Sequence, residues 1–287
     1  MGWVFAAPFT LLFVVFMLVP IIASFALSFT GFSLGNLQDL RSTPFVGLDN
    51  YTRLFEDAQF LKSLRNTAYF VVVGVPFTIA FGLVLAVMLN QGIGKLRAVF
   101  RVGLYLPVVT SIVAVAVIWR YMLDPDIGIV NAALAQVGIQ GPDWLGNPNT
   151  LMPSIIALGV WRNTGNAMVI FLAALQTVDS QLYQAAKVDG AKGWHLFRHI
   201  TVPLLRPAIL FATVVTTISY THVFEEPFVM AGPNGGTDQA GLTTSLFVYQ
   251  QGFQAFDFGY ASAAAYTLFV AIVVLTIVQF RVLRVRT

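Results

Sequence analysis

Six stretches of this chain are apolar for about 20 residues or more, and their length limits what the chain can fold into. A helix of about 20 mainly apolar residues spans the hydrocarbon core of a bilayer. Strands of a membrane barrel would be about 10 residues long and would alternate apolar with polar positions, which these stretches do not. The sequence therefore predicts an all-α, polytopic integral membrane protein with six transmembrane helices, at residues 3–29, 68–89, 102–122, 151–175, 207–230 and 259–280.

The composition supports this prediction. Only 10% of the 287 residues are charged and 57% are hydrophobic, whereas about 25% of the residues in a soluble domain are charged. The chain has no cysteine, which excludes disulfides and cysteine-ligated metals. The net charge of +3 is small, so we interpret the basic residues as determinants of membrane topology rather than as a nucleic-acid surface.

The basic residues also predict the orientation, because Lys and Arg accumulate in the cytoplasmic loops of membrane proteins. With the N-terminus inside, the cytoplasmic segments hold ten Lys or Arg residues and the outer segments hold four. The outer segments 123–150 and 231–258 hold none. Both termini are therefore predicted to be cytoplasmic. The chain begins almost inside its first apolar stretch, so we expect a short cytoplasmic leader to be missing.

Proline and glycine mark further features of the apolar regions. Pro76 and Pro107 interrupt the second and third predicted spans, and we expect bends there, since such breaks are tolerated where neighbouring groups satisfy the backbone. The outer sequence "GPNGGT" at 232–237 is rich in turn residues. An extracytoplasmic protein could dock near this segment.

One polar stretch, "YQAAKVDGAKGWHLFRHITVPLLRP" at 183–207, stands between the fourth and fifth apolar regions. Asp179 is a natural N-cap for a helix, and Gly190 can adopt the left-handed conformation that ends one. A second helical pattern follows, with Trp194 and Phe197 on one face. We predict a compact helix–turn–helix on the cytoplasmic side, with small residues that let another surface approach. An ordinary basic loop that only fixes topology is the alternative.

This stretch resembles the cytoplasmic loop of permease subunits of ATP-binding-cassette importers. The family signature runs Glu-Ala-Ala, then Asp-Gly, then Ile-x-Leu-Pro. Gln184 stands in place of the Glu and Val202 in place of the Leu, and Gln keeps hydrogen-bonding capacity but lacks the charge. The resemblance implies a coupling loop at 176–206 that contacts a partner ATPase. The residues implied in coupling are Gln184, Ala185, Ala186, Asp189, Gly190, Ala191, Trp194 and Phe197.

The resemblance extends over nearly the whole chain and is closest to the sugar-importer branch. "FVGLDNYTRLF" at 45–55, "FRVGLYLP" at 100–107 and "FGYASA" at 258–263 are similar to segments of that branch. The chain is therefore identified as a member of the binding-protein-dependent sugar permease family. This implies a single transmembrane permease domain over 1–287, multi-pass in a bacterial or archaeal plasma (inner) membrane.

The same resemblance implies the partners. They are a second homologous permease subunit, a dimer of ATP-binding subunits and an extracytoplasmic solute-binding protein, assembled in a lipid bilayer without nucleic acid. The chain has no phosphate-binding loop, because "GIGKL" at 92–96 lacks the spacing and the hydroxyl. We therefore expect no enzyme activity, no catalytic residue, no metal site and no cofactor in this chain, with ATP and Mg bound by the partner ATPase.

Polar groups within the spans are the candidates for a substrate pathway, since such groups usually face a cavity or the bundle interior. In the sugar permease family that this chain resembles, the helices before and after the cytoplasmic loop line the sugar site. One polar set lies in the middle of the fourth span and a second near the outer end of the fifth. The expected pathway residues are Arg162, Asn163, Asn166, Ser219, Tyr220, His222, Glu225 and Glu226.

Other interpretations of these residues stay open. Arg162 could simply pair with Glu225 or Glu226 and join two helices, and the two asparagines could serve as interhelical hydrogen bonds. His222 and the two glutamates could also couple transport to ions, and the chain would then be a secondary transporter without an ATPase. The expected function is import of an oligosaccharide or related solute by alternating access, with the ion-coupled transporter as the alternative.

Overall fold

The computed structural model describes residues 2–39, 42–90 and 96–282. Arg41, Lys95, Arg284 and Arg286, which were counted for topology, lie outside these ranges, as does most of "GIGKL". Within the ranges every regular element is helical, which confirms the all-α class. The elements are α1 (Gly2–Phe13), η1 (Val14–Leu18), α2 (Val19–Leu27), η2 (Leu34–Leu37), α3 (Asp49–Glu56), α4 (Ala58–Asn90), α5 (Arg97–Val109), α6 (Ile112–Met122), α7 (Ile129–Gln136), α8 (Pro148–Gln176), α9 (Ser180–Val188), α10 (Gly193–Leu196), η5 (Phe197–Thr201), α11 (Val202–Leu204), α12 (Arg206–Thr221), α13 (Glu225–Ala231), η6 (Thr237–Gln239), α14 (Thr244–Tyr249), η7 (Gln250–Gln254) and α15 (Phe258–Val282).

Four helical stretches in the described chain are long and apolar enough to cross a membrane: Phe5–Leu27, Ala58–Asn90, Pro148–Gln176 and Phe258–Val282. They coincide with the first, second, fourth and sixth predicted spans. Two more stretches are bent helix pairs, and the total is six if each pair counts as one span. The bend is 95° between α5 and α6, and 69° where the α10–α11 segment meets α12.

The third predicted span, in which a bend was expected at Pro107, is divided into two helices, α5 and α6. The helix ends at Val109, and the next two residues have extended ψ values of 151° and 122°. Pro107 lacks a backbone N–H and weakens the helix just before this point. The hydroxyl of Thr110 donates to the carbonyls of Leu106 and Pro107 at 3.1 and 2.9 Å, so it replaces the backbone donors that the break removes.

The fifth predicted span is also divided. Helix α12 ends at Thr221, and the separate helix α13 begins at Glu225. Pro227 falls in the first turn of α13, where a missing N–H costs no helical hydrogen bond; a continuous helix would have placed it in the interior. Pro76 behaves differently from the expectation, because α4 continues through it without a break.

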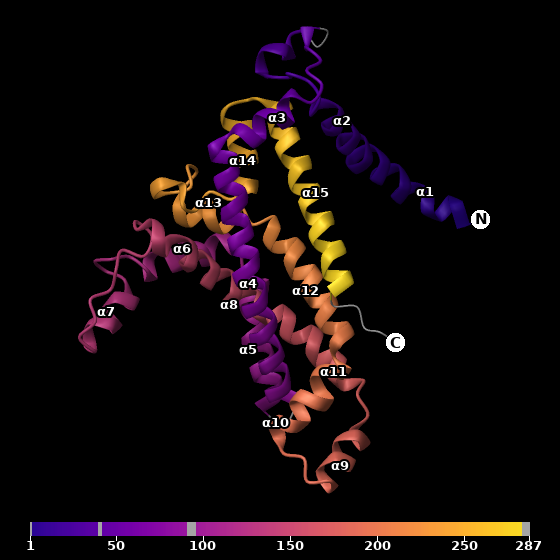
Figure 1. Ribbon diagram of the computed structural model, residues 1–287, viewed down its shortest axis with the longest axis vertical. Coiled ribbons are helices and arrows are strands. Elements are labelled where there is room, and N and C mark those ends of the chain that lie inside the picture. Colours follow the sequence, from indigo (N-terminus) through magenta and orange to yellow (C-terminus); the bar gives the residue numbers. More distant parts are fainter. Residues whose placement is uncertain (1, 40–41, 91–95, 283–287) are drawn as a thin grey trace.

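The core of the molecule is the pair α4 and α8, which run side by side through its centre (Figure 1). Glycine allows their close approach: a Cβ atom added to Gly82 would lie 2.6 Å from Ala167 Cβ and 3.0 Å from the Met168 backbone nitrogen. Helix α5 packs on α8 in the same manner, since a Cβ on Gly165 would lie 2.5 Å from the Leu104 carbonyl oxygen. Small residues at such contacts are typical of helix pairs in membranes.

The first span lies apart from this core (Figure 1). In its most apolar window 0% of the residues are buried inside the molecule. It contacts α15, where the Tyr266 hydroxyl donates to the Ile21 carbonyl at 2.5 Å. The "FVGLDNYTRLF" segment then ties it to α3, because Asn50 Nδ2 donates to the carbonyls of Ser28 and Thr30, both at 2.9 Å.

Candidate substrate pathway and coupling element

The predicted pathway residues lie on α8, α12 and α13, which pack against one another or against α4, except for His222, which lies between α12 and α13. On α8, Asn163 is half-buried, and its Nδ2 donates to the Gly159 carbonyl at 2.9 Å. Asn166 is exposed one turn further along the helix. Arg162 is half-buried, and its Nε atom is buried without a hydrogen-bond partner. The middle of α8 thus carries polar groups whose hydrogen-bonding capacity is only partly used.

Tyr220 joins α12 to both central helices. Its hydroxyl lies 2.6 Å from Thr78 Oγ1 on α4 and also interacts with the side chain of Asn163 on α8. Its ring packs edge-on against Phe70, with 4.9 Å between the ring centroids. Only 3% of Tyr220 is exposed. This residue therefore holds three helices together behind the more exposed polar groups.

The remaining predicted residues lie where α12 gives way to α13. Ser219 and His222 are exposed, and His222 Nδ1 donates to the Ile218 carbonyl at 2.9 Å, which satisfies an acceptor in the last turn of α12. Glu225 is exposed, whereas Glu226 is buried. The sequence placed these side chains on one continuous helix, and the structure places them on both sides of a helix break.

Arg162 makes no ion pair within 4.0 Å with Glu225 or Glu226 in the part of the chain that the structure describes. The charge of Arg162 nevertheless acts on the Glu226 carboxyl group, as does that of Glu225. The structure thus brings one guanidinium and two carboxylates into the same region without a contact pair. Such groups keep donors and acceptors for a polar ligand.

Two polar contacts in this region were not predicted. Thr78 pairs with Tyr220, and Gln279 Nε2 on α15 donates to Thr217 Oγ1 on α12 at 2.6 Å. A glutamine inside an apolar span is a signal that could have been noticed. The threonines give little signal, since a threonine hydroxyl commonly bonds to a carbonyl of its own helix.

The predicted helix–turn–helix is present, and it begins with a capped helix. Asp179 Oδ1 accepts a hydrogen bond from the Gln181 backbone N–H at 2.9 Å, as expected of an N-cap. At the other end of α9, Gly190 has φ +81°. The N–H groups of Gly190 and Ala191 donate to the carbonyls of Lys187 and Ala186 at 3.0 and 2.9 Å. This left-handed glycine ends the helix and turns the chain.

The second arm is α10 followed by the π-helical turn η5 and by α11. Trp194 stacks on Phe197 with 5.5 Å between the ring centroids, and His195 stacks on His199 at 4.0 Å. The Tyr183 hydroxyl lies 3.1 Å from Thr201 Oγ1 and links the two arms. Pro203 is accommodated in the first turn of α11, so it does not break this arm.

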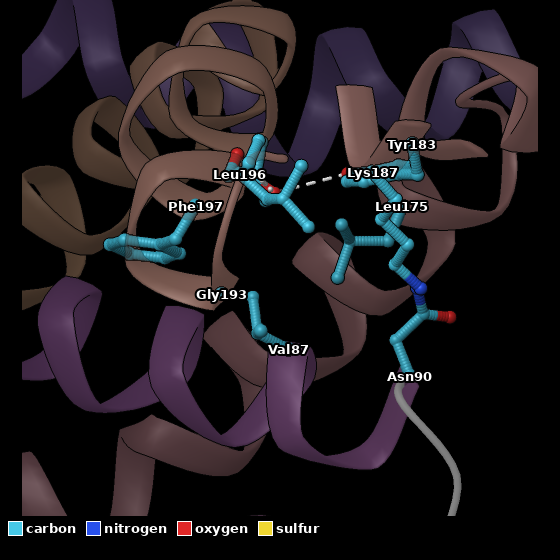
Figure 2. Close-up of a pocket in the computed structure, with 10 residues that line it drawn as sticks. Val87, Asn90, Leu175, Tyr183, Lys187, Gly193, Leu196 and Phe197 are labelled. Carbon is cyan, nitrogen blue, oxygen red and sulfur yellow. Dashed lines mark hydrogen bonds between the residues drawn. The ribbon is translucent and has the colours of Figure 1, made fainter. Parts of the chain in front are cut away.

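Helices α9 and α10, with the Gly190 turn between them, form a helical hairpin. This hairpin lies at one end of the molecule, below the ends of α4 and α5 in Figure 1. A cavity of about 450 Å³ lies between part of it and the helical bundle, while Phe197 and Val202 pack against the apolar core of that bundle. Figure 2 shows Val87 and Asn90 of α4 on one side of this cavity, with Leu196 and Phe197 of the second arm across from Leu175 and Lys187. The hairpin is thus attached at its base and open elsewhere.

The predicted coupling residues are largely solvent-accessible. Trp194 is 70% exposed. Ala186, Ala191 and Phe197 are half-buried, and the other residues of the set are exposed: Gln184, Ala185, Asp189 and Gly190. The second arm therefore presents an exposed aromatic ring next to basic side chains.

Within residues 2–39, 42–90 and 96–282, no group of three or more His, Asp or Glu side chains is placed to hold a metal ion. The predicted pathway residues on α8, α12 and α13 carry a guanidinium, carboxamides, hydroxyls and carboxylates. These groups recognise ligands through hydrogen bonds.

Comparison with known proteins gives concordant likenesses. The family described as "Binding-protein-dependent transport system inner membrane component" matches residues 78–286. The lactose transport system permease protein LacF of Rhizobium radiobacter is 38% identical, over 99% of this chain and 94% of that protein. The arabinooligosaccharides transport system permease protein AraP of Bacillus subtilis is 33% identical, over 97% of this chain and 87% of that protein.

A solved structure is similar as well. It is the crystal structure of a bacterial alginate ABC transporter in complex with an alginate pentasaccharide-bound periplasmic protein. One of its chains matches with a TM-score of 0.79 and 25% sequence identity. The match covers 98% of this chain and 93% of that chain.

Proposed function

This chain belongs to the family of binding-protein-dependent transport system inner membrane components, and from that premise we propose that it is the permease subunit of an ATP-binding-cassette importer that carries a sugar. The family expected from the sequence is confirmed. The observation that carries the proposal is the likeness over 99% of the chain to a lactose permease.

We propose an oligosaccharide or a related solute as the substrate. The similar proteins are described as handling lactose, arabinooligosaccharides and alginate, which are all sugars joined by glycosidic bonds. Planar polar side chains such as carboxamide, guanidinium and carboxylate groups can pair with neighbouring sugar hydroxyls. The pathway we propose runs past Arg162, Asn163 and Asn166 of α8 and the polar side chains from Ser219 to Glu226.

The transport cycle we propose is alternating access across six spans, with each bent helix pair counted as one span and both termini in the cytoplasm. A second permease subunit would complete the pathway, and an extracytoplasmic binding protein would deliver the solute. ATP and Mg would bind to a separate ATPase dimer. The hairpin α9–α10 would receive movement from that dimer, a role supported by its exposed Trp194.

The test is solute-stimulated ATP hydrolysis by the purified complex, reconstituted in liposomes with its binding protein and a panel of sugars. Stimulation by an oligosaccharide is the expected result, and Gly190→Pro should abolish both stimulation and uptake, since proline cannot adopt φ +81°. Uptake that persists in Gly190→Pro without ATP, and that is lost in Glu225→Gln, would instead identify the ion-coupled transporter. That alternative is not favoured by the family to which the chain belongs.

A further inference from the structure

The cavity at the base of the hairpin has an apolar wall. Its volume is about 450 Å³, and it lies where the ends of α4 and α8 meet the hairpin. The wall belongs to both sides, with Val87 and Leu175 from the bundle and Leu196 and Phe197 from the second arm. Leu175 is buried in the apolar core of the bundle, and Val87 and Phe197 pack against that core. A ligand that fills this cavity therefore needs an apolar part.

One edge of the same cavity is basic. Lys187 is the single charged residue among the described residues that line it. Its ammonium group forms no ion pair within 4.0 Å in the described chain, and Figure 2 shows its side chain directed toward that of Asn90. Arg97 Nη2 donates to Asn90 Oδ1 at 3.1 Å, which brings a second cation to this edge. A guanidinium has five N–H donors, so this bond leaves Arg97 able to donate to a ligand as well.

The described residues around the cavity include no acidic group that opposes these two cations. Helices α4, α5 and α8 contain neither Asp nor Glu. The two acidic residues of the hairpin, Asp179 and Asp189, do not line the cavity. Lys187 alone gives the lining residues a formal charge of +1, and Arg97 raises the charge of this edge to +2. A ligand that fits here is anionic as well as partly apolar.

We propose that the cavity binds an anionic phospholipid of the cytoplasmic leaflet, with its phosphate at Lys187 and Arg97 and the first part of an acyl chain against Val87 and Leu196. The inference rests on the proposed function, which includes the orientation that makes the hairpin cytoplasmic. In that orientation the cavity lies at the cytoplasmic ends of the apolar helices α4 and α8, which is the level of the lipid headgroups. Basic pockets between helices on this side of a membrane bind such headgroups.

A lipid matches this place better than a free phosphate does. A free phosphate would leave the apolar wall in contact with water, which is unfavourable. Apolar side chains next to the cavity residues are also exposed, since Met88 beside Val87 is 58% exposed and Leu96 beside Arg97 is 56% exposed. An acyl chain that leaves the cavity therefore continues along apolar surface.

A lipid in this cavity would affect how the hairpin is held. The lining residues come from α4, from α8 and from both arms of the hairpin, so the bound lipid contacts the bundle and the hairpin together. Its binding stabilises the position of the hairpin relative to the bundle. We therefore expect anionic lipid to increase solute-stimulated ATP hydrolysis by the assembled transporter.

The test measures lipid binding to the purified complex of the permease with its partner subunits in detergent, with phosphatidylglycerol as the probe. Native mass spectrometry at increasing lipid concentration gives the apparent affinity. Lys187→Gln should weaken binding about fivefold, which corresponds to about 1 kcal/mol for one basic residue near a headgroup. Lys187→Gln combined with Arg97→Gln should weaken it about tenfold or more.

Lys192→Gln is the matched control, because it removes the same charge from the hairpin at a residue that does not line this cavity. It should change the affinity less than about twofold, since a charge outside the cavity acts through screening solvent. Phosphatidylcholine, which has the same acyl chains and no net charge, should bind more weakly and should not distinguish the variants.

Equal effects of Lys187→Gln and Lys192→Gln on phosphatidylglycerol binding would overturn the inference, as would an equal loss with phosphatidylcholine. Displacement of the lipid by the same concentration of inorganic phosphate would assign the cavity to a free anion and would also overturn it. So would dissociation of a partner subunit in Lys187→Gln with lipid binding unchanged, because Lys187 would then contact a protein.

Solute-stimulated ATP hydrolysis in liposomes separates this inference from the proposed function. Stimulation that is greater with phosphatidylglycerol than with phosphatidylcholine, and that loses this difference in Lys187→Gln, supports both. Equal stimulation in the two lipids, with no effect of Lys187→Gln on lipid binding, would overturn the inference alone. No stimulation by any sugar in either lipid would contradict the proposed function, whereas the binding titration would still test the lipid site.

Discussion

Helix α8 and the α9–α10 hairpin follow one another in the chain, yet α8 is largely buried against other helices and the hairpin is largely exposed. In the most apolar window of α8, 61% of the residues are buried, and its partners are α4, α5 and α12. In α9 and α10 no described residue is buried. The polar groups of α8 find partners within the chain, such as Asn163 with Gly159, whereas those of the hairpin mostly face outward.

This difference separates two kinds of exposed apolar surface. No residue in the most apolar window of the first span is buried, as expected of a helix in contact with lipid or with other subunits. Val188 and Trp194 are exposed as well, but they lie in a short, capped and charged element. The comparison indicates that changes in α8 will affect folding, whereas changes in the hairpin will affect the assembly.

The largest effect is expected from Gly82→Val, at the contact between α4 and α8. The added side chain would collide with Ala167 and with the Met168 backbone, and overpacking of this kind costs about 3 kcal/mol. The thermal stability of the purified chain measures it. Gly103→Val on α5 is the matched control, because a Cβ there has no neighbour within 4 Å. Equal losses of stability in both variants would contradict the packing argument.

Trp194→Ala should leave stability unchanged and reduce solute-stimulated ATP hydrolysis about tenfold or more, since it removes an aromatic anchor. Phe253→Ala serves as the control. Its side chain is 68% exposed, close to the 70% of Trp194, but it belongs to a different element, η7. The account fails if the control reduces hydrolysis as strongly as the hairpin variant.

Gly190→Ala isolates the backbone of the turn. A Cβ atom there has no neighbour within 4 Å, so strain comes only from φ +81°, at about 1 kcal/mol. We expect a several-fold loss of solute-stimulated ATP hydrolysis, with no change in the melting temperature of the spans. Gly193→Ala, also without a neighbour and without a positive φ, should have no effect. An inactive Gly193→Ala would show that the hairpin does not tolerate any side chain there.

Thr78→Val removes the partner that α4 provides to Tyr220. The Tyr220 hydroxyl would remain buried with one bond fewer, at a cost of about 1–2 kcal/mol. Thr267→Val is the comparison, because within the described residues the hydroxyl of Thr267 donates to the Ala263 carbonyl of its own helix and not to another helix. Chemical denaturation in detergent should rank Thr78→Val as the less stable variant, and the reverse order would argue against a three-helix role for Tyr220.

The smallest effect is expected at an exposed ion pair. Arg53 and Asp257 lie 3.2 Å apart, with their side chains 60% and 29% exposed. The Arg53 guanidinium also lies 4.1 Å from the centroid of the Tyr260 ring. Arg53→Gln should lower stability by about 0.5–1 kcal/mol, and part of the loss should disappear at high salt. A loss as large as that of Thr78→Val would mean that this contact is not screened by solvent.

The sequence predicted the class of fold and the hairpin because both depend on local signals. Run length is enough to place a span such as 148–176, and Asp179 with Gly190 is enough to delimit α9. A bend was expected at Pro107, and the helix breaks just after it, at Thr110 and Ser111. The break near His222 was missed because the fifth span was extended through the polar residues that follow Thr221. At both breaks a side chain bonds a backbone carbonyl that the broken helix leaves free: Thr110 bonds Leu106, and His222 bonds Ile218. Near Thr110 a proline, Pro107, also weakens the helix.

The candidate pathway was predicted only as a set of residue types. Helical spacing places Asn163 and Asn166 near one another, but it cannot show that Tyr220 is buried between Phe70 and Thr78. That arrangement depends on how α4, α8 and α12 pack, which no single segment encodes. Tertiary packing also decides that the charge of Arg162 acts on Glu226 although the two side chains form no ion pair within 4.0 Å.

The central claim is that the hairpin is where another subunit docks, and a cross-linking experiment tests it most directly. The chain has no cysteine, so single substitutions provide unique attachment points. We expect a thiol cross-linker at Gln184→Cys to join the chain to the ATP-binding subunit in the assembled complex. The matched substitution Asn234→Cys, in the "GPNGGT" loop, should give no such product. Cross-linking to the ATP-binding subunit from Asn234→Cys, with none from Gln184→Cys, would contradict the account.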